Sequence, residues 1–222
     1  MKERGLIFNG EMVRAILDGR KTQTRRPVKF PLIDKNMGCE LAGNELAGEL
    51  AAGNYWNSPF GKPGDRLWVR ETWADVNHEG CPAVAYRADG DVRDLHDDGE
   101  ENDPNLEKYW FAKWYPDLIS GTEGRWTPSI HMPRWASRIT LEITGVRVER
   151  LASITEEDAR AEGVQQIRGG FWRHYQPEWT QHQLSARGSF VTLWKSIYGE
   201  ESWQANPWVW VIEFKSIEGG AA

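Results

Sequence analysis

The sequence predicts an α+β fold, because strand-like and helix-like hydrophobic patterns alternate along its 222 residues. Alternating or continuous apolar residues indicate strands at 66–73, 137–151 and 208–214. Apolar residues at helical spacing indicate helices at 12–17 and 189–198. Hydrophobic residues make up 40% of the chain and charged residues 27%, which is typical of a globular protein that buries a core.

The remaining elements follow from shorter signals. A strand at 6–8 precedes the first helix, and a second short strand is expected at 83–86. A further helix begins after Ser153 or Thr155, since each of these hydroxyls is followed three positions later by an acidic residue, as in a capping box. Gly163 is expected to end that helix.

Two segments are predicted to be insertions in a single domain that covers residues 1–222. Residues 32–58 are rich in Gly, Ala, Asn and Glu, which is typical of an insertion or a flexible loop. The second segment is 89–125, in which residues 89–107 carry nine acids and only one Arg or Lys, Arg93. Such a charge balance has little capacity to form a core.

Composition excludes several classes of function. The formal net charge of −6 argues against a general binder of duplex DNA. No apolar run has the length of a membrane span and no signal peptide is recognised at the N-terminus, so we expect a cytoplasmic protein without membrane contact. Cys39 and Cys81 are too few for a disulfide scaffold or a Cys-rich zinc site, and the five His form no helical metal pair. We therefore expect no metal and no other cofactor.

A basic run stands out in this acidic chain. Five cations and no acid lie between Arg20 and Lys29. One interpretation is a solvated turn after a short helix, whose C-terminal end favours cations. The other is a site in which the Thr24 hydroxyl lies three residues from Lys21, as a nucleophile beside its base.

The strand at 66–73 joins aromatic and charged residues. Strand alternation puts Leu67 and Val69 on one face and Trp68 and Arg70 on the other. A charged residue such as Arg70 or Glu71 that faced the interior would require a partner or a ligand. The chain has 13 Trp, which either fill the core or provide stacking platforms for a base.

The stretch Gly19-Arg20-Lys21-Thr22-x-Thr24-x-Arg26 resembles the motif of the ASCH family, which has a PUA-like fold. The resemblance is supported by Gly64-Asp65 at the start of a strand, by the segment 151–163 and by the closing strand 210–214. It does not cover the two predicted insertions. The layout also resembles ASCH proteins carried by bacteriophages and prophages.

The resemblance implies a small mixed β-barrel flanked by helices, with a cleft for RNA, nucleosides or modified bases. The family includes amidohydrolases that remove acetyl from N4-acetylcytidine with a lysine, a threonine and a glutamate. Carried over to this chain, these are Lys21, Thr24 and Glu162. Thr24 would attack the acetyl carbonyl, Lys21 would take the proton, and Glu162 would orient Lys21 or relay the proton to the leaving amine.

Other residues of the predicted site would bind the ligand. The arginines would stabilise an oxyanion or hold a phosphate, and a Trp would stack on the pyrimidine. The predicted ligand-binding residues are Arg20, Arg25, Arg26, Trp68, Arg70 and Trp73. The chain is about twice as long as these enzymes, so its insertions could reshape the cleft.

Three functions remain open on the sequence. The first is an amidohydrolase acting on an N4-acylated cytidine-type nucleoside or nucleotide. The second is a module that binds single-stranded RNA or a modified base without turnover, which the same cations and aromatic rings would serve. The third is a phage accessory protein that acts through protein contacts, because a fold does not determine a function.

Overall fold

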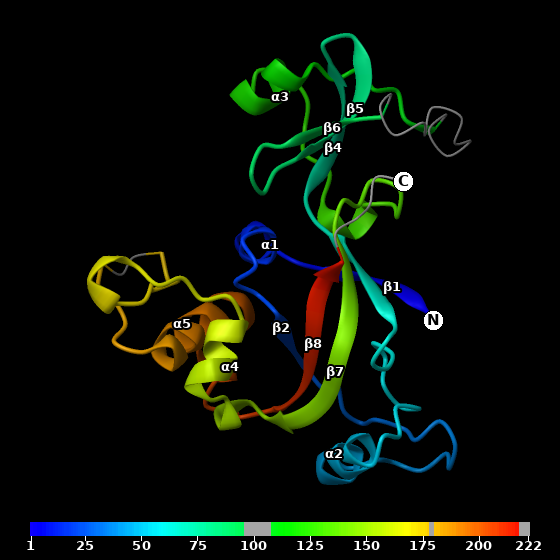
Figure 1. The fold of residues 1–222 in the computed structure, drawn as a ribbon, viewed down its shortest axis with the longest axis vertical. Helices are drawn as coiled ribbons and strands as arrows, with labels where there is room; N and C mark the ends of the chain where they lie inside the picture. Colours follow the sequence, from blue (N-terminus) through cyan, green and yellow to red (C-terminus); the bar gives the residue numbers. More distant parts are fainter. Residues whose placement is uncertain (96–107, 178–179, 218–222) are drawn as a thin grey trace. The chain divides into compact units, whose positions relative to one another are not determined.

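The computed structural model describes residues 1–95, 108–177 and 180–217, and these form a mixed α+β structure with two sheets (Figure 1). The predicted α+β class is therefore confirmed. The larger sheet has the strand order β1-β3-β7-β8-β2, and the smaller has the order β4-β5-β6. The strands are β1 (Glu3–Ile7), β2 (Gln23–Pro27), β3 (Arg66–Arg70), β4 (Trp73–His78), β5 (Cys81–Tyr86), β6 (Val92–Asp94), β7 (Thr140–Arg150) and β8 (Trp208–Ile217).

Helices connect these strands. The α-helices are α1 (Gly10–Leu17), α2 (Gly43–Ala51), α3 (Tyr115–Ser120), α4 (Glu156–Ala161) and α5 (Ala186–Tyr198). The 3-10 helices are η3 (Ser129–His131), η4 (Leu151–Ser153), η5 (Arg168–Gly170) and η6 (Glu200–Ser202). None of the helices in the described part of the chain combines the length and the apolar character that crossing a bilayer requires.

Both sheets are open within the described residues, so a closed barrel of the PUA-like kind is not observed there. The chain divides into two compact units. The first comprises Met1–Glu3, Ala15–Arg66 and Leu141–Ser216. The second comprises Arg4–Arg14, Leu67–Thr140 and Ile217–Ala222, as far as these are described.

The first unit is built on the neighbouring strands β7, β8 and β2. Strand β2 pairs antiparallel with β8, and Arg25 lies opposite Val211 while Arg26 lies opposite Trp210. Helices α4 and α5 lie side by side next to these strands (Figure 1). Their apolar core takes Val209 and Val211 from β8 and joins them to side chains of α4, α5 and the loops around them. The cluster consists of Leu151, Ile154, Ala159, Val164, Trp172, Ala186, Phe190, Leu193, Trp194, Val209 and Val211.

The second unit is built on the β4-β5-β6 sheet, which has apolar packing on both faces. On one face Trp73 meets Trp135 edge-on, with ring centroids 5.7 Å apart, in a cluster that includes Tyr86. On the other face small side chains such as Ala74 and Ala85 pack beneath Leu118 of α3. A sheet covered on both faces favours the nearly continuous apolar run seen in β5.

The predicted insertions contain ordered elements. Residues 43–51 form helix α2 where an insertion or a flexible loop was expected. The Glu45 carboxylate accepts a hydrogen bond from the Ala42 N–H at 3.0 Å, which satisfies a donor at the start of the helix. In the second segment β6 and α3 are formed, and residues 96–107 lie outside the described residues.

Candidate functional site

Part of the basic run forms strand β2, Gln23–Pro27, inside the first unit, so the interpretation of the whole run as a solvated turn is wrong. Helix α1 ends at Leu17, and Gly19 turns the chain with φ +71°. The Lys21 N–H then donates to Ala15 O at 2.9 Å, and the chain continues into β2. Four of its residues are buried with exposed fractions of 3% or less: Lys21, Gln23, Thr24 and Arg25.

The Lys21 ammonium contacts Glu162 in the interior. Its Nζ donates to Glu162 Oε2 at 2.8 Å and to the Glu162 carbonyl at 2.9 Å. The exposed fractions of the two side chains are 0% and 2%. The two residues also form an antiparallel backbone bridge, so the main chain holds amine and carboxylate in register.

Gly163 permits this close approach. It follows the C-cap residue Glu162 with φ +87°, a conformation that favours glycine. A Cβ at this position would lie 2.7 Å from Lys21 Cβ and 2.9 Å from Ala15 Cβ. The expected helix stop therefore also makes room for Lys21.

Arg25 is the second cation on Glu162. Its Nη1 donates to Glu162 Oε1 at 3.1 Å, and its Nη2 donates to Glu149 Oε1 at 2.6 Å. Asp158 Oδ2 lies 3.4 Å from the same Nη2. The Arg25 side chain is 0% exposed, so its guanidinium is surrounded by carboxylates of the chain itself. This arrangement makes Arg25 a positioning residue for Glu162 rather than a clamp for an external anion.

Burial lowers the pKa of Lys21 below the ordinary value of 10.5. The Glu162 carboxylate opposes this effect, and the charges of Arg26 and Arg25 add to it. The lowering prevails because desolvation is the largest of these effects. Lys21 thus reaches the neutral amine, the form that accepts a proton, at a lower pH than an exposed lysine.

Helix α4 carries Asp158, and its C-cap residue is Glu162, so it positions two acids of this network. Of the two predicted caps, Thr155 is the one used: its Oγ1 accepts from the Asp158 N–H at 3.0 Å. Burial alone would raise the pKa of Asp158, but hydrogen bonds from Thr155 and Gln23 and the charge of Arg25 lower it to about 2. Asp158 also pairs with Arg147 at 2.9 Å. The cap, β2 and β7 are therefore linked through one carboxylate.

Thr24 belongs to the opposite face of β2 from Arg25. Thr24 lies opposite Ile212 of β8, whereas Arg25 lies opposite Val211, which belongs to the core with α4 and α5. Successive side chains of a strand point to opposite faces, so Thr24 points away from that core. Thr24 is 0% exposed, and its Oγ1 has no hydrogen-bond partner in the described part of the chain. The structure thus brings together Lys21 and Glu162 of the predicted triad but does not connect the Thr24 hydroxyl to them.

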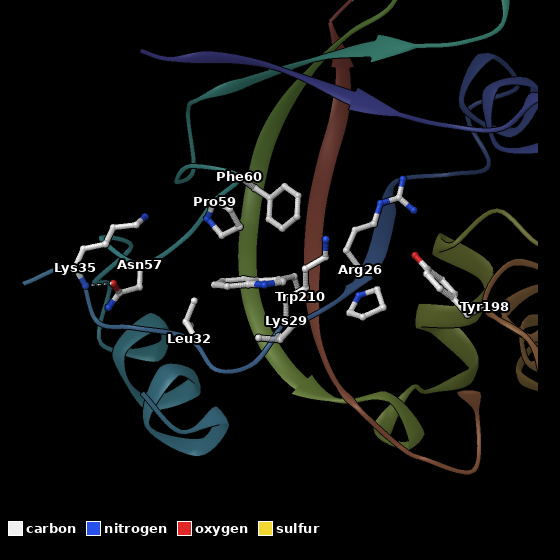
Figure 2. Close-up of a pocket in the computed structure, with 11 residues that line it drawn as sticks. Arg26, Lys29, Leu32, Lys35, Asn57, Pro59, Phe60, Tyr198 and Trp210 are labelled. Carbon is white, nitrogen blue, oxygen red and sulfur yellow. Dashed lines mark hydrogen bonds between the residues drawn. The ribbon is translucent and has the colours of Figure 1, made fainter. Parts of the chain in front are cut away.

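Arg26 shares the Thr24 face and lines a pocket of about 560 Å3 (Figure 2). Trp210, its cross-strand partner, forms part of the wall. Phe60 meets the Trp210 ring edge-on, with centroids 5.9 Å apart and planes at 72°. Further walls come from the loop that contains Lys29 and from Tyr198 of α5.

The other predicted ligand residues have different surroundings. The Arg20 guanidinium donates to Asp18 and to the Gly163 carbonyl, both at 2.7 Å. Trp68, Arg70 and Trp73 belong to the second unit. There Arg70 lies over the Trp68 ring at 5.3 Å and donates to the Ile130 carbonyl. Trp73 is 1% exposed and packs among aromatic core rings, so this tryptophan fills the core as one of the two interpretations expected.

The second unit contains a buried acid whose partner the sequence did not indicate. Glu71 is 1% exposed, and Arg138 donates to its two carboxylate oxygens at 3.0 and 3.1 Å. Burial raises the pKa of Glu71 against the opposing effect of Arg138. Arg138 also lies 4.0 Å from the centre of the Tyr86 ring and pairs with Asp89. The expectation that an inward-facing charge at Glu71 needs a partner is thus met by an arginine 67 positions away.

Sequence analysis missed the acids around Arg25 and the walls of the pocket. Glu149 could have been found, because it alternates with Val148 along β7. The sequence indicated Lys29 only as a member of the basic run and Trp210 only as part of the closing strand, and it did not single out Phe60. No local pattern indicates that these distant residues meet.

The described residues contain no cluster of three or more His, Cys, Asp or Glu side chains that could hold a metal ion. A scan with protein-family models, a search of curated proteins and a search of solved structures each found no match to the chain. The function is therefore argued from the site itself.

Proposed function

We propose that this chain is an ASCH-type protein of PUA-like fold, in which Lys21 and Glu162 handle protons during hydrolysis of an N4-acylated cytidine-type nucleoside or nucleotide. The supporting observation is the buried contact of Lys21 Nζ with Glu162 Oε2 at 2.8 Å. A lysine whose pKa is lowered by burial is a competent general base closer to neutral pH. The motif around residues 19–26 supports the family assignment.

In the proposed reaction the amide C–N bond breaks and a water supplies OH to the acyl group and H to the amine. In the motif-based scheme the Thr24 oxygen attacks the acyl carbon and forms a Thr24 ester as the C–N bond breaks, and the water then cleaves that ester. Neutral Lys21 takes the proton of the attacking hydroxyl. The resulting ammonium is stabilised by Glu162 and later returns a proton to the leaving amine. Arg25 keeps the Glu162 carboxylate oriented throughout.

The test is incubation of the purified protein with N4-acetylcytidine, with cytidine and acetate followed by chromatography. Lys21→Met removes the base and keeps most of the volume, and Lys62→Ala, at an exposed lysine, is the matched control. Turnover by wild type and Lys62→Ala, and none by a folded Lys21→Met, supports the proposal. Absence of turnover by wild type on N4-acylated nucleosides and nucleotides overturns it.

A second candidate is a module that binds a modified base or single-stranded RNA without turnover. It is favoured by the alternation of β2, which assigns Thr24 to the face opposite Arg25 and leaves the nucleophile unconnected to Lys21. This function predicts oligonucleotide binding by a protein that does not turn over any acylated cytidine. Thr24→Val separates the two candidates, because it would abolish hydrolysis and leave binding unchanged.

A further inference from the structure

The pocket lined by Arg26 and Trp210 is not used by the Lys21 centre. Arg26 and Trp210 lie opposite each other in the β2–β8 pair, on the face away from Arg25 and the α4 acids. We propose that this pocket binds a nucleoside monophosphate unit, with its planar base beside Trp210 and its phosphate held by an exposed lysine of the lining, Lys29 or Lys35. The proposal does not depend on hydrolysis at Lys21.

The size and the walls suit a ring. The volume of about 560 Å3 lies within the range of about 300–1,000 Å3 usual for small-molecule sites. Figure 2 shows the Trp210 indole among the drawn side chains, with Phe60 and Pro59 toward one side and Leu32 toward the other. Aromatic rings in an apolar wall bind a base through stacking and edge contacts, without a requirement for one base identity.

The charge of the lining selects an anion. Arg26, Lys29 and Lys35 all line the pocket, and no carboxylate belongs to its lining, although the protein carries a net charge of −6. Lys29 and Lys35 are exposed, and neither forms an ion pair with a carboxylate of the described residues. The positive charges of Lys29 and Lys35 favour an anion such as a phosphate at this lining.

Hydrogen bonds hold the Lys35 segment in place. Asn57 Oδ1 accepts from the Lys35 N–H at 3.0 Å, and Asn57 Nδ2 donates to Glu49 at 3.0 Å. The Lys35 ammonium donates to the Trp56 carbonyl at 3.1 Å, which uses one of its three N–H donors. The lysine is therefore positioned by the protein while donors remain for a phosphate.

A nucleoside monophosphate combines the planar ring and the phosphate that this lining recognises. The unit could come from a free nucleotide or from one position of a single-stranded RNA, because both present the same base and phosphate. An RNA gains contacts outside the pocket, so the two sources differ in affinity rather than in the local chemistry.

The experiment is isothermal titration calorimetry of the full chain at low salt with four probes: CMP, cytidine, inorganic phosphate and a single-stranded ten-nucleotide RNA. The key variant is Lys29→Ala/Lys35→Ala, and Lys62→Ala is the matched control at an exposed lysine outside the pocket lining. We expect the double variant to weaken CMP binding at least tenfold and cytidine binding less than twofold. Phe60→Ala should weaken both ligands by a similar factor, since it removes the ring and no charge.

Each result decides the proposal. The site is supported, and RNA is identified as the source of the ligand, if the RNA binds more than tenfold tighter than CMP and loses affinity in the double variant by the same factor. Similar affinities of RNA and CMP for the wild type identify the free nucleotide. Any of three results overturns the proposal. These are no binding of CMP or RNA, equal CMP binding by wild type and the Lys29→Ala/Lys35→Ala variant, and inorganic phosphate binding as tightly as CMP. Turnover of N4-acetylcytidine, measured on the same proteins, fails or succeeds independently because that probe has no phosphate.

Discussion

Replacing Glu162 by Gln tests whether the Lys21 contact is a buried ion pair. The substitution keeps the shape and one acceptor oxygen but removes the charge that faces Lys21 and Arg25. Arg25 retains the carboxylates of Glu149 and Asp158, so the loss falls mainly on Lys21. Removal of one partner of a buried pair costs about 3–5 kcal/mol, and we expect a loss in the free energy of unfolding of this size at pH 7.

The pH dependence of this loss has a definite sign. In wild type the folded-state pKa of Lys21 already lies below 10.5, so stability rises as pH increases from that lowered value toward 10.5. Without Glu162 the pKa falls further, and the folded Glu162→Gln variant then holds Lys21 as a neutral amine. Deprotonating an ordinary lysine at pH 7 costs about 4.6 kcal/mol, and at pH 10 only about 0.5 kcal/mol. The deficit of the variant should therefore shrink as pH rises from 7 to 10.

The assay is urea unfolding at pH 7, 8.5 and 10 for wild type, Glu162→Gln, Lys21→Met and the double variant. A double-mutant cycle then gives the coupling between the two side chains, which we expect to exceed about 2 kcal/mol at pH 7. Asp18→Asn, at an exposed acid paired with Arg20, is the control and should change stability by less than about 0.5 kcal/mol. A loss below about 1 kcal/mol for Glu162→Gln that does not vary with pH would refute the ion-pair argument.

Three further predictions concern the same unit. Asp158→Asn should lower the unfolding free energy by about 1 kcal/mol at pH 7, a small loss because the carboxylate is partly screened by solvent. The lowered pKa of Asp158 contributes stability above about pH 4 that is lost as pH falls toward 2. The variant and wild type should therefore converge in urea unfolding at pH 2. Gly163→Ala should lower the unfolding free energy by about 2 kcal/mol or more, because the added Cβ would contact Lys21. Gly19→Ala should cost about 1 kcal/mol, because Gly19 also has a positive φ but no described atom lies within 4 Å of the added Cβ. Equal losses in thermal denaturation would contradict the steric argument. Thr24→Val should keep or raise the melting temperature, because the buried hydroxyl has no hydrogen-bond partner among the described residues. A marked drop would mean that the hydroxyl is hydrogen-bonded in solution.

Local signals predicted much of the framework correctly. Helical spacing at residues 12–17 and the apolar run at 208–214 correspond to α1 and β8. The capping-box pattern predicted the start of α4 to within the choice between Ser153 and Thr155. An acid at the C-terminal end of a helix, such as Glu162, is unfavourable without a nearby cation, and Lys21 of the basic run is that cation. These features depend on neighbours within a few residues, so the sequence carries them directly.

Tertiary structure alone decided that the middle of the basic run is a largely buried strand. The residues Gln23–Pro27 have no apolar alternation, so no local pattern favours a strand. They are buried because β8 supplies their backbone partners and because Glu149, Asp158 and Glu162 neutralise Arg25 and Lys21 from 124 to 141 positions away. The cost of burying a charge is offset only when such distant partners meet it, and a single sequence does not indicate which acids these are.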